Sequence, residues 1–152
     1  MLINRKTIHI EWGDCDALGI VYYPRYMAYF DNCTAALFLR AGLPKQEMLG
    51  KYGIAGIPMV DLKANFKIPS RFGDDVIVES CIPEWRRSSF RVHHRLLAAG
   101  NLAVECFELR VWVGKSADDP EKLQSRPVPQ EVIDRFTTAS DLHAASHHPA
   151  EK

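Results

Sequence analysis

The sequence has no excess of charge of either sign and no long apolar run. Its 152 residues include 19 Lys and Arg against 19 Asp and Glu, so the formal net charge is zero. Without an overall positive field, binding to the phosphate backbone of nucleic acids is disfavoured. The most apolar stretch, residues 27–39, is interrupted by polar side chains and is shorter than the roughly 20 residues that span a bilayer. We therefore expect neither nucleic-acid binding nor a membrane span.

Signals for secretion and for metal binding are also missing. Basic residues interrupt the first ten positions, which lack the continuous apolar segment of a signal peptide, so a cytoplasmic location is expected. The four cysteines, Cys15, Cys33, Cys81 and Cys106, match no CxxC or zinc-finger spacing, and the histidines have no ligand spacing. We expect reduced thiols, no metal site and no cofactor.

The first third of the chain predicts a strand, a loop and a long helix. Residues 6–11 alternate polar and apolar side chains, which is typical of a half-buried strand. Residues 13–19 are rich in glycine and short acids and predict a loop. Pro24 suits the start of a helix, and Gly42-Leu43-Pro44 suits its end. The residues between them are apolar nearly all round, which predicts a buried helix.

The rest of the chain predicts four successive antiparallel strands and a short last helix. The strands are expected at residues 61–68, 76–85, 90–96 and 102–113, and the helix at 127–136. These elements satisfy the layer rule if the sheet wraps around the long helix. The predicted fold is α+β, a hotdog fold in which a curved antiparallel sheet of about five strands wraps around a long central helix.

The predicted fold has consequences for domain organisation and assembly. We expect residues 1–136 to form a single hotdog domain and residues 137–152 to form a flexible C-terminal tail. One side of the helix still needs a cover, and curved sheets with exposed edges tend to pair. A homo-oligomer, either a dimer or a tetramer, is therefore expected.

Two acidic residues lie shortly before the expected helix. Asp14 and Asp16 stand in the glycine-bounded loop, nine and seven residues before Tyr23. A helix N-terminus can polarise a carbonyl and hold a developing oxyanion, while a carboxylate attacks the carbonyl carbon or activates water. Alternatively, both acids are turn and capping residues that hydrogen-bond their own loop. Local sequence leaves both interpretations open.

A longer pattern surrounds these acids. Residues 11–26, Glu-Trp-Gly-Asp-Cys-Asp-Ala-Leu-Gly-Ile-Val-Tyr-Tyr-Pro-Arg-Tyr, closely resemble the signature of the 4-hydroxybenzoyl-CoA thioesterase family of hotdog enzymes. Further matches lie at residues 42–44, 53–58 and 84–90, so the resemblance runs from about residue 6 to residue 135. The Gly-x-Ser-x-Gly motif of α/β-hydrolases is absent.

The resemblance implies roles for individual residues at the reaction centre. It makes Asp16 the catalytic carboxylate and the backbone N–H of Tyr23 the group that polarises the thioester carbonyl. Asp14 is then a loop organiser. Asp31 would approach the distal end of the acyl group, where the 4-hydroxybenzoyl enzyme recognises a phenol hydroxyl. From the residues alone, Asp31 could instead face a neighbouring arginine or a second subunit.

Two departures from the family pattern concern substrate binding. The tryptophan that assists at the acyl end in the 4-hydroxybenzoyl enzyme would fall at about Lys45, and this sequence has none there. Arg86 and Arg87 suit the phosphates of coenzyme A, although surface arginines are commonly just solvated. The third basic residue of the family cluster is Ser88 here.

The sequence therefore predicts an acyl-CoA thioesterase that hydrolyses an aromatic thioester, such as 4-hydroxybenzoyl- or benzoyl-CoA, to a free acid and CoA. Two alternatives stay open: an aliphatic acyl-CoA or acyl-ACP thioesterase of the same fold, and a non-catalytic module that binds acyl-CoA. Residue types do not decide whether Asp16 forms an acyl-enzyme anhydride or acts as a general base.

Overall fold

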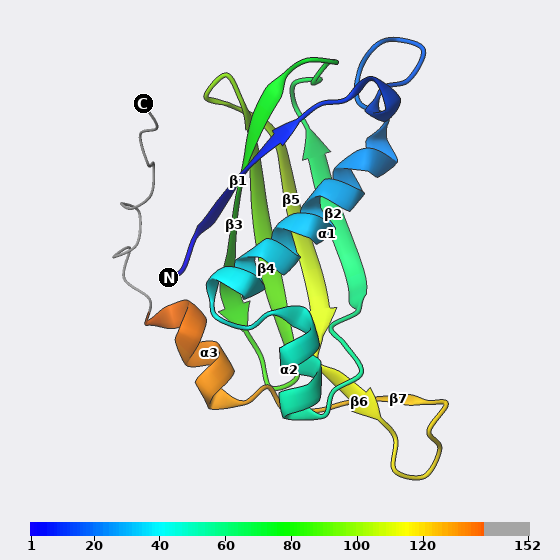
Figure 1. Ribbon diagram of the computed structural model, residues 1–152, viewed down its shortest axis with the longest axis vertical. Coiled ribbons are helices and arrows are strands. Elements are labelled where there is room, and N and C mark those ends of the chain that lie inside the picture. Colours follow the sequence, from blue (N-terminus) through cyan, green and yellow to red (C-terminus); the bar gives the residue numbers. More distant parts are fainter. Residues whose placement is uncertain (139–152) are drawn as a thin grey trace, which may run out of the picture.

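A curved antiparallel sheet surrounds one long helix in the computed structural model, which describes residues 1–138 (Figure 1). The strand order is β1-β3-β4-β5-β2, and every neighbouring pair is antiparallel. The strands are β1 (Asn4–His9), β2 (Met59–Phe66), β3 (Asp75–Trp85), β4 (Ser89–Ala98) and β5 (Asn101–Val111). The predicted α+β hotdog fold is confirmed.

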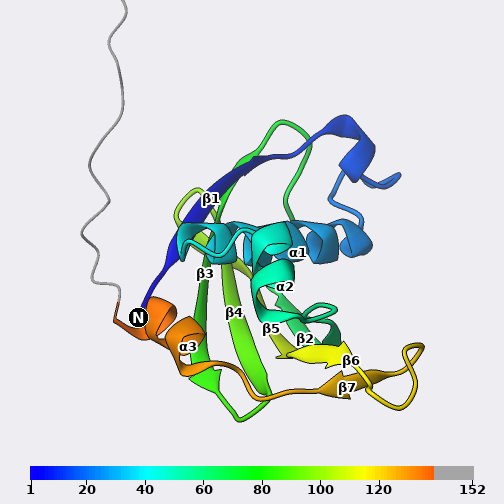
Figure 2. The same ribbon diagram turned by 60° about the horizontal axis from the view of Figure 1, so that its bottom comes forward.

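The central helix is α1 (Tyr23–Arg40). It begins one residue earlier than predicted, with Pro24 at the second helical position, where a missing N–H leaves no hydrogen bond unmade. It ends before Gly42, whose φ of 74° favours glycine. Figure 2 shows the sheet curving around α1, from β1 above the helix to β5 and β2 below it. Within residues 1–138, no helix is long and apolar enough to cross a membrane.

Helix α1 is buried on the side that faces the sheet and exposed on the other, as expected of a helix whose second side still needs a cover. The sheet-facing side chains Phe30, Cys33 and Leu37 are completely buried, whereas Leu39 is 61% exposed. A single chain offers only one sheet face to the helix, so the opposite side of α1 stays open to solvent.

Two short helices and a hairpin lie at the end of the sheet that is opposite the loop before α1. Helix α2 (Lys45–Tyr52) follows Pro44 after the end of α1, and α3 (Gln130–Thr137) packs Phe136 against Phe38. The hairpin of β6 (Val113–Lys115) and β7 (Leu123–Ser125) was not predicted, because three-residue strands are too short to show alternation. Residue 137 ends α3 rather than starting the predicted tail, and residues 139–152 of that tail lie outside the described residues.

The end of β2 corrects a further expectation. Residues 62, 64, 66 and 68 are apolar and alternate with polar residues, which predicts one buried face, but the side chains of Phe66 and Ile68 are 53% and 40% exposed. Regular pairing stops after Phe66, because the N–H groups of Lys67 and Ile68 both donate to the carbonyl of Ala103. The apolar side chains at this point are therefore left at the surface beside the loop before α1.

All four cysteines are free thiols. Burial raises the pKa of Cys33 to about 11 and that of Cys106 to about 12. These two behave as small apolar side chains of the core.

Arg126 fastens the β6–β7 hairpin to the end of α2. It donates from Nη1 to the Gly53 carbonyl at 3.0 Å and from Nη2 to the Lys115 carbonyl at 2.8 Å. A Cβ on Gly114 would overlap its guanidinium. Gly114→Ala should therefore displace Arg126 and lower the free energy of unfolding by about 1–2 kcal/mol, measured by urea denaturation. In an Arg126→Ala variant the guanidinium is already absent, so adding Gly114→Ala should lower the free energy of unfolding only slightly further. A second decrease as large as that of Gly114→Ala alone would contradict this explanation.

Candidate active site

The loop between β1 and α1 is fixed by Asp14. Its carboxylate accepts the N–H of Glu11 at 3.0 Å, and its carbonyl accepts the N–H of Tyr22 at 2.8 Å. Its Oδ1 also lies 3.8 Å from Nε of Arg25 in the first turn of α1. These contacts close the short 3-10 helix η1 (Trp12–Asp14) and tie it to the start of α1. Asp14 thus has the loop-organising contacts that were expected of it.

Asp16 is held differently, with one carboxylate oxygen engaged and the other free. Its Oδ1 accepts the N–H of Leu18 at 2.8 Å, and its backbone pairs with Ile20 and Gly19. Gly19 closes this turn with a φ of 73°, a conformation that glycine adopts without strain. Among the described residues, Oδ2 of Asp16 has no hydrogen-bond partner, and the residue is exposed.

A cavity of about 380 Å³ lies between this turn and the first turn of α1. Asp16 and Tyr23 both line it, and its remaining walls are largely aromatic and aliphatic, including Tyr26, Phe66 and Ile68. The backbone N–H of Tyr23 stands at the first helical position, where the helix itself offers no acceptor, and no described residue accepts it. Asp16 and Tyr23, the two residues that the sequence analysis paired, therefore line one cavity.

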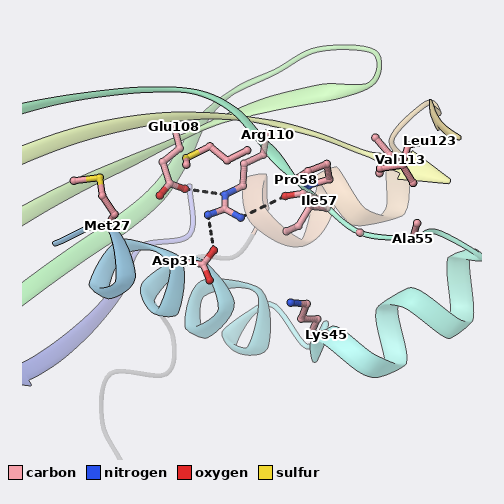
Figure 3. Close-up of a pocket in the computed structure, with 12 residues that line it drawn as sticks. Met27, Asp31, Lys45, Ala55, Ile57, Pro58, Glu108, Arg110, Val113 and Leu123 are labelled. Carbon is pink, nitrogen blue, oxygen red and sulfur yellow. Dashed lines mark hydrogen bonds and ion pairs between the residues drawn. The ribbon is translucent and has the colours of Figure 1, made fainter. Parts of the chain in front are cut away.

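A second cavity, of about 500 Å³, lies further along α1 (Figure 3). Asp31 lines it, eight residues after Tyr23 and so about 12 Å along the helix. Lys45, the position near which the family tryptophan is missing, lines the same cavity. The first cavity reaches Phe66 at the end of β2 and the second reaches Met59 at its start. The two cavities thus follow one another along the α1–β2 side of the molecule.

Asp31 meets an arginine, one of the alternatives left open by the sequence. Arg110 donates from Nη2 to Asp31 Oδ1 at 2.8 Å and from Nε to Glu108 Oε2 at 2.8 Å (Figure 3). The side chains of Arg110 and Glu108 are 8% and 1% exposed, against 69% for Asp31. Burial opposes the ionisation of Glu108, but the nearby His94, 3.6 Å away, and the hydrogen bond from Arg110 prevail and lower its pKa to about 2. Glu108 is therefore a carboxylate at neutral pH.

Sequence reasoning missed Glu108 and Arg110, although a signal for them exists. Glu108 and Arg110 lie on the same face of β5 as Cys106 and come before Trp112 in the sequence. All four residues are buried. Two adjacent inward positions of a core strand therefore carry opposite charges. Because buried charges need partners, this pattern alone indicates an ion pair beneath the helix.

Arg86 and Arg87 belong to the turn between β3 and β4, which lies at the other end of the sheet from the loop that connects β1 to α1 (Figure 1). Strand β5 runs between these ends with 11 residues, which is roughly 36 Å. Arg86 Nε pairs with Glu84 at 2.7 Å, and Arg87 is exposed. One chain thus brings together Asp16 and Tyr23, places Asp31 in the neighbouring cavity, and leaves the two arginines away from both.

Comparison with known proteins gives the family. Residues 10–136 match the Thioesterase-like superfamily. The chain is 35% identical over 131 residues to 4-hydroxybenzoyl-CoA thioesterase from Pseudomonas sp. (strain CBS-3), covering 82% of this chain and 91% of the relative. The crystal structure of that thioesterase matches with a TM-score of 0.80 and 32% identity, covering 88% of this chain and 98% of the other. A gentisyl-coenzyme A thioesterase matches with a TM-score of 0.75 and 29% identity, covering 88% and 99%. The chain therefore belongs to the Thioesterase-like superfamily.

Proposed function

We propose that the protein is an acyl-CoA thioesterase that hydrolyses an aromatic thioester, of the 4-hydroxybenzoyl- or benzoyl-CoA kind, to the free acid and CoA. Family membership supports thioester hydrolysis, and two relatives act on hydroxylated aroyl thioesters by their names. The observation that carries the proposal is the cavity lined by both Asp16, which has one carboxylate oxygen without a described partner, and Tyr23 at the start of α1.

Two routes use this pair. In both, the thioester carbonyl accepts the Tyr23 N–H, which stabilises the negative charge that develops on its oxygen. In the first, Asp16 attacks the carbonyl carbon, CoA leaves as the thiolate, and water hydrolyses the mixed anhydride. In the second, Asp16 takes a proton from the water that attacks. We favour the first route; in single turnover in oxygen-18 water it places label in Asp16 when water attacks the anhydride at the Asp16 carboxyl carbon, whereas the second route never labels Asp16.

The acyl end of the proposed site favours a ring with a polar group over a long alkyl chain. The second cavity contains Asp31 and Arg110 beside its apolar walls, and an alkyl chain there would cover charged groups without satisfying them. Turnover of benzoyl-, 4-hydroxybenzoyl-, butyryl- and longer acyl-CoA tests this. Faster turnover of the aroyl thioesters is expected. Preference for the alkyl thioesters would instead support the aliphatic alternative, and tight binding without turnover would support a non-catalytic module.

A second copy of the chain is proposed to complete the site. The α1–β2 side is open, β2 is an edge strand, and apolar side chains such as Val60 remain exposed on it. Arg86 and Arg87 are also too remote from Asp16 of their own chain to share a catalytic cavity with it. Sedimentation equilibrium should show a dimer or tetramer, and a monomer at assay concentration would contradict this.

Replacing both Arg86 and Arg87 with alanine should raise KM for acyl-CoA by about 10-fold, because charge-assisted hydrogen bonds to the nucleotide phosphates are lost. A truncated pantetheine thioester, which lacks the nucleotide, should keep its KM. The matched control is Arg5→Ala with Arg95→Ala, since both of these arginines pair with Glu79 on the sheet. Equal effects on the two substrates would show that the arginines do not contact the nucleotide.

A further inference from the structure

A chain of buried hydrogen bonds leads from β3 through the core to the second cavity. His94 Nδ1 lies 2.7 Å from Ser80 Oγ, and its Nε2 lies 3.2 Å from Thr34 Oγ1. Thr34 in turn donates to Glu108 Oε2 at 3.2 Å, and Arg110 Nε donates to the same oxygen at 2.8 Å. Ser80, Thr34, His94 and Glu108 are all at most 1% exposed. Four elements, β3, β4, α1 and β5, thus meet in one polar chain.

The donors in this chain follow a single order. Because the Thr34 hydroxyl proton goes to Glu108, its oxygen is available to accept from Nε2–H of His94. The other ring nitrogen then accepts from the hydroxyl of Ser80. This order requires a neutral imidazole, and burial lowers the pKa of His94 in agreement. The chain ends on Glu108, whose charge is met by Arg110.

The geometry of the two elements then fixes Arg110 against Asp31. Glu108 and Arg110 lie two residues apart on one face of β5, and Asp31 and Thr34 lie three apart on one face of α1. Arg110 is held by Glu108, by the Ile57 carbonyl at 3.3 Å from Nη1, and by Asp31. Among the described residues, only Oδ1 of Asp31 is engaged, so Oδ2 remains available to a ligand in the cavity.

Stability is only a weak reason for this arrangement. A buried ion pair costs desolvation, and apolar side chains of similar volume often serve a core equally well. Here Arg110 links the buried Glu108 to Asp31, whose side chain is largely exposed in the second cavity. Its structural effect is to immobilise one oxygen of that carboxylate.

We propose that Arg110 is a positioning residue that sets the specificity of the acyl site. Held by Glu108, it fixes Asp31 so that Oδ2 accepts a hydrogen bond from a hydroxyl on the acyl ring. Two carboxylates flank one guanidinium, so this cluster has negative charge left to accept from a hydroxyl donor, while the ammonium group of Lys45 lines the same cavity. This inference rests on the proposed aroyl-CoA substrate and on the ring contact of Asp31 that the family resemblance implies, and it adds the role of Arg110.

Equilibrium binding of non-hydrolysable analogues tests the proposal without needing turnover. The probes are two CoA thioethers, 4-hydroxyphenacyl-CoA and phenacyl-CoA, which differ only in the hydroxyl. By calorimetry the wild-type protein should bind the hydroxylated probe more tightly. Arg110→Lys, which keeps the charge but loses the planar fork, should reduce the ratio of the two affinities by about 5-fold or more.

Further variants separate positioning from folding. Glu108→Gln combined with Arg110→Met removes both buried charges together, so neither is left unpaired, and it should also reduce the ratio about 5-fold. Arg95→Met removes an arginine from an ion pair of 2.9 Å with Glu79 elsewhere on the sheet and should leave the ratio unchanged.

The outcomes distinguish this inference from the proposed function. An unchanged ratio in the folded variants, or no preference for the hydroxyl in the wild-type protein, would overturn the role of Arg110. Absence of turnover with every thioester would overturn the proposed enzyme, while the affinity ratio would still report on Arg110.

Discussion

Asp16→Asn should lower kcat by at least about 100-fold, the lower range for loss of an acid–base or nucleophilic group. Asparagine has nearly the same shape as aspartate, and its amide oxygen can still accept the N–H of Leu18, so the turn should persist. The substitution removes the negative charge on the oxygen that has no partner in the described residues. KM should change little, because the apolar walls of the cavity are untouched.

Asp14→Asn is the matched comparison for this experiment. It neutralises the other acid of the same loop, whose carboxylate accepts the N–H of Glu11 rather than facing an open cavity. This variant should lose thermal stability but retain at least about tenfold more activity than Asp16→Asn. Near wild-type turnover of Asp16→Asn, or equal loss from the two variants, would remove Asp16 from the mechanism.

The reaction centre was predictable because its parts are close in the sequence. Asp16 and Tyr23 are separated by seven residues, and a proline next to the aromatic residue marks the helix start. A loop that enters a helix must pass the free N–H groups of the first turn, so little tertiary information is needed to pair them. Asp14 was distinguished from Asp16 by the resemblance, and its observed hydrogen bonds agree with that distinction.

The acyl end of the site could not be assembled in the same way. Alternation along β4 and β5 is enough to place His94, Glu108 and Arg110 on the inward faces of their strands. Which helix residues meet them depends on the position of α1 across the sheet, and no local pattern fixes that position. The contact of Asp31 with Arg110 spans 79 positions of sequence and is a product of tertiary packing.

The fold itself was predictable to the level of its main elements. Long alternating strands and an apolar 18-residue helix give strong periodic signals. The prediction of buried side chains fails at the end of β2, where the backbone hydrogen bonds depart from the sequence pattern. The alternation continues to Ile68, but regular strand pairing stops where the N–H groups of Lys67 and Ile68 share one carbonyl acceptor. The exposed side chains that result, Phe66 and Ile68, form part of the wall beside Asp16.

Asp31→Ala should reduce kcat/KM for 4-hydroxybenzoyl-CoA by about 10-fold or more while affecting benzoyl-CoA much less. A hydrogen bond to a charged group is worth about 1.5–3 kcal/mol, and only the hydroxylated ring makes one to Oδ2 of Asp31 in the proposed complex. The substitution should not unfold the protein, because Arg110 keeps its ion pair of 2.8 Å with the buried Glu108. The exposed side chain of Asp31 contributes no core packing.

Two enzymes assayed with two substrates isolate the hydroxyl contact from general damage to α1. If Asp31 only stabilised the helix or Arg110, its loss would disturb both thioesters equally, since both need the same cavity walls and the same helix N-terminus. A larger loss for the hydroxylated substrate therefore measures recognition of the ring substituent. Equal losses would make Asp31 a structural partner of Arg110. Recognition of the acyl ring would then depend on other residues of the cavity, such as Lys45, a charged side chain that has no ion-pair partner among the described residues.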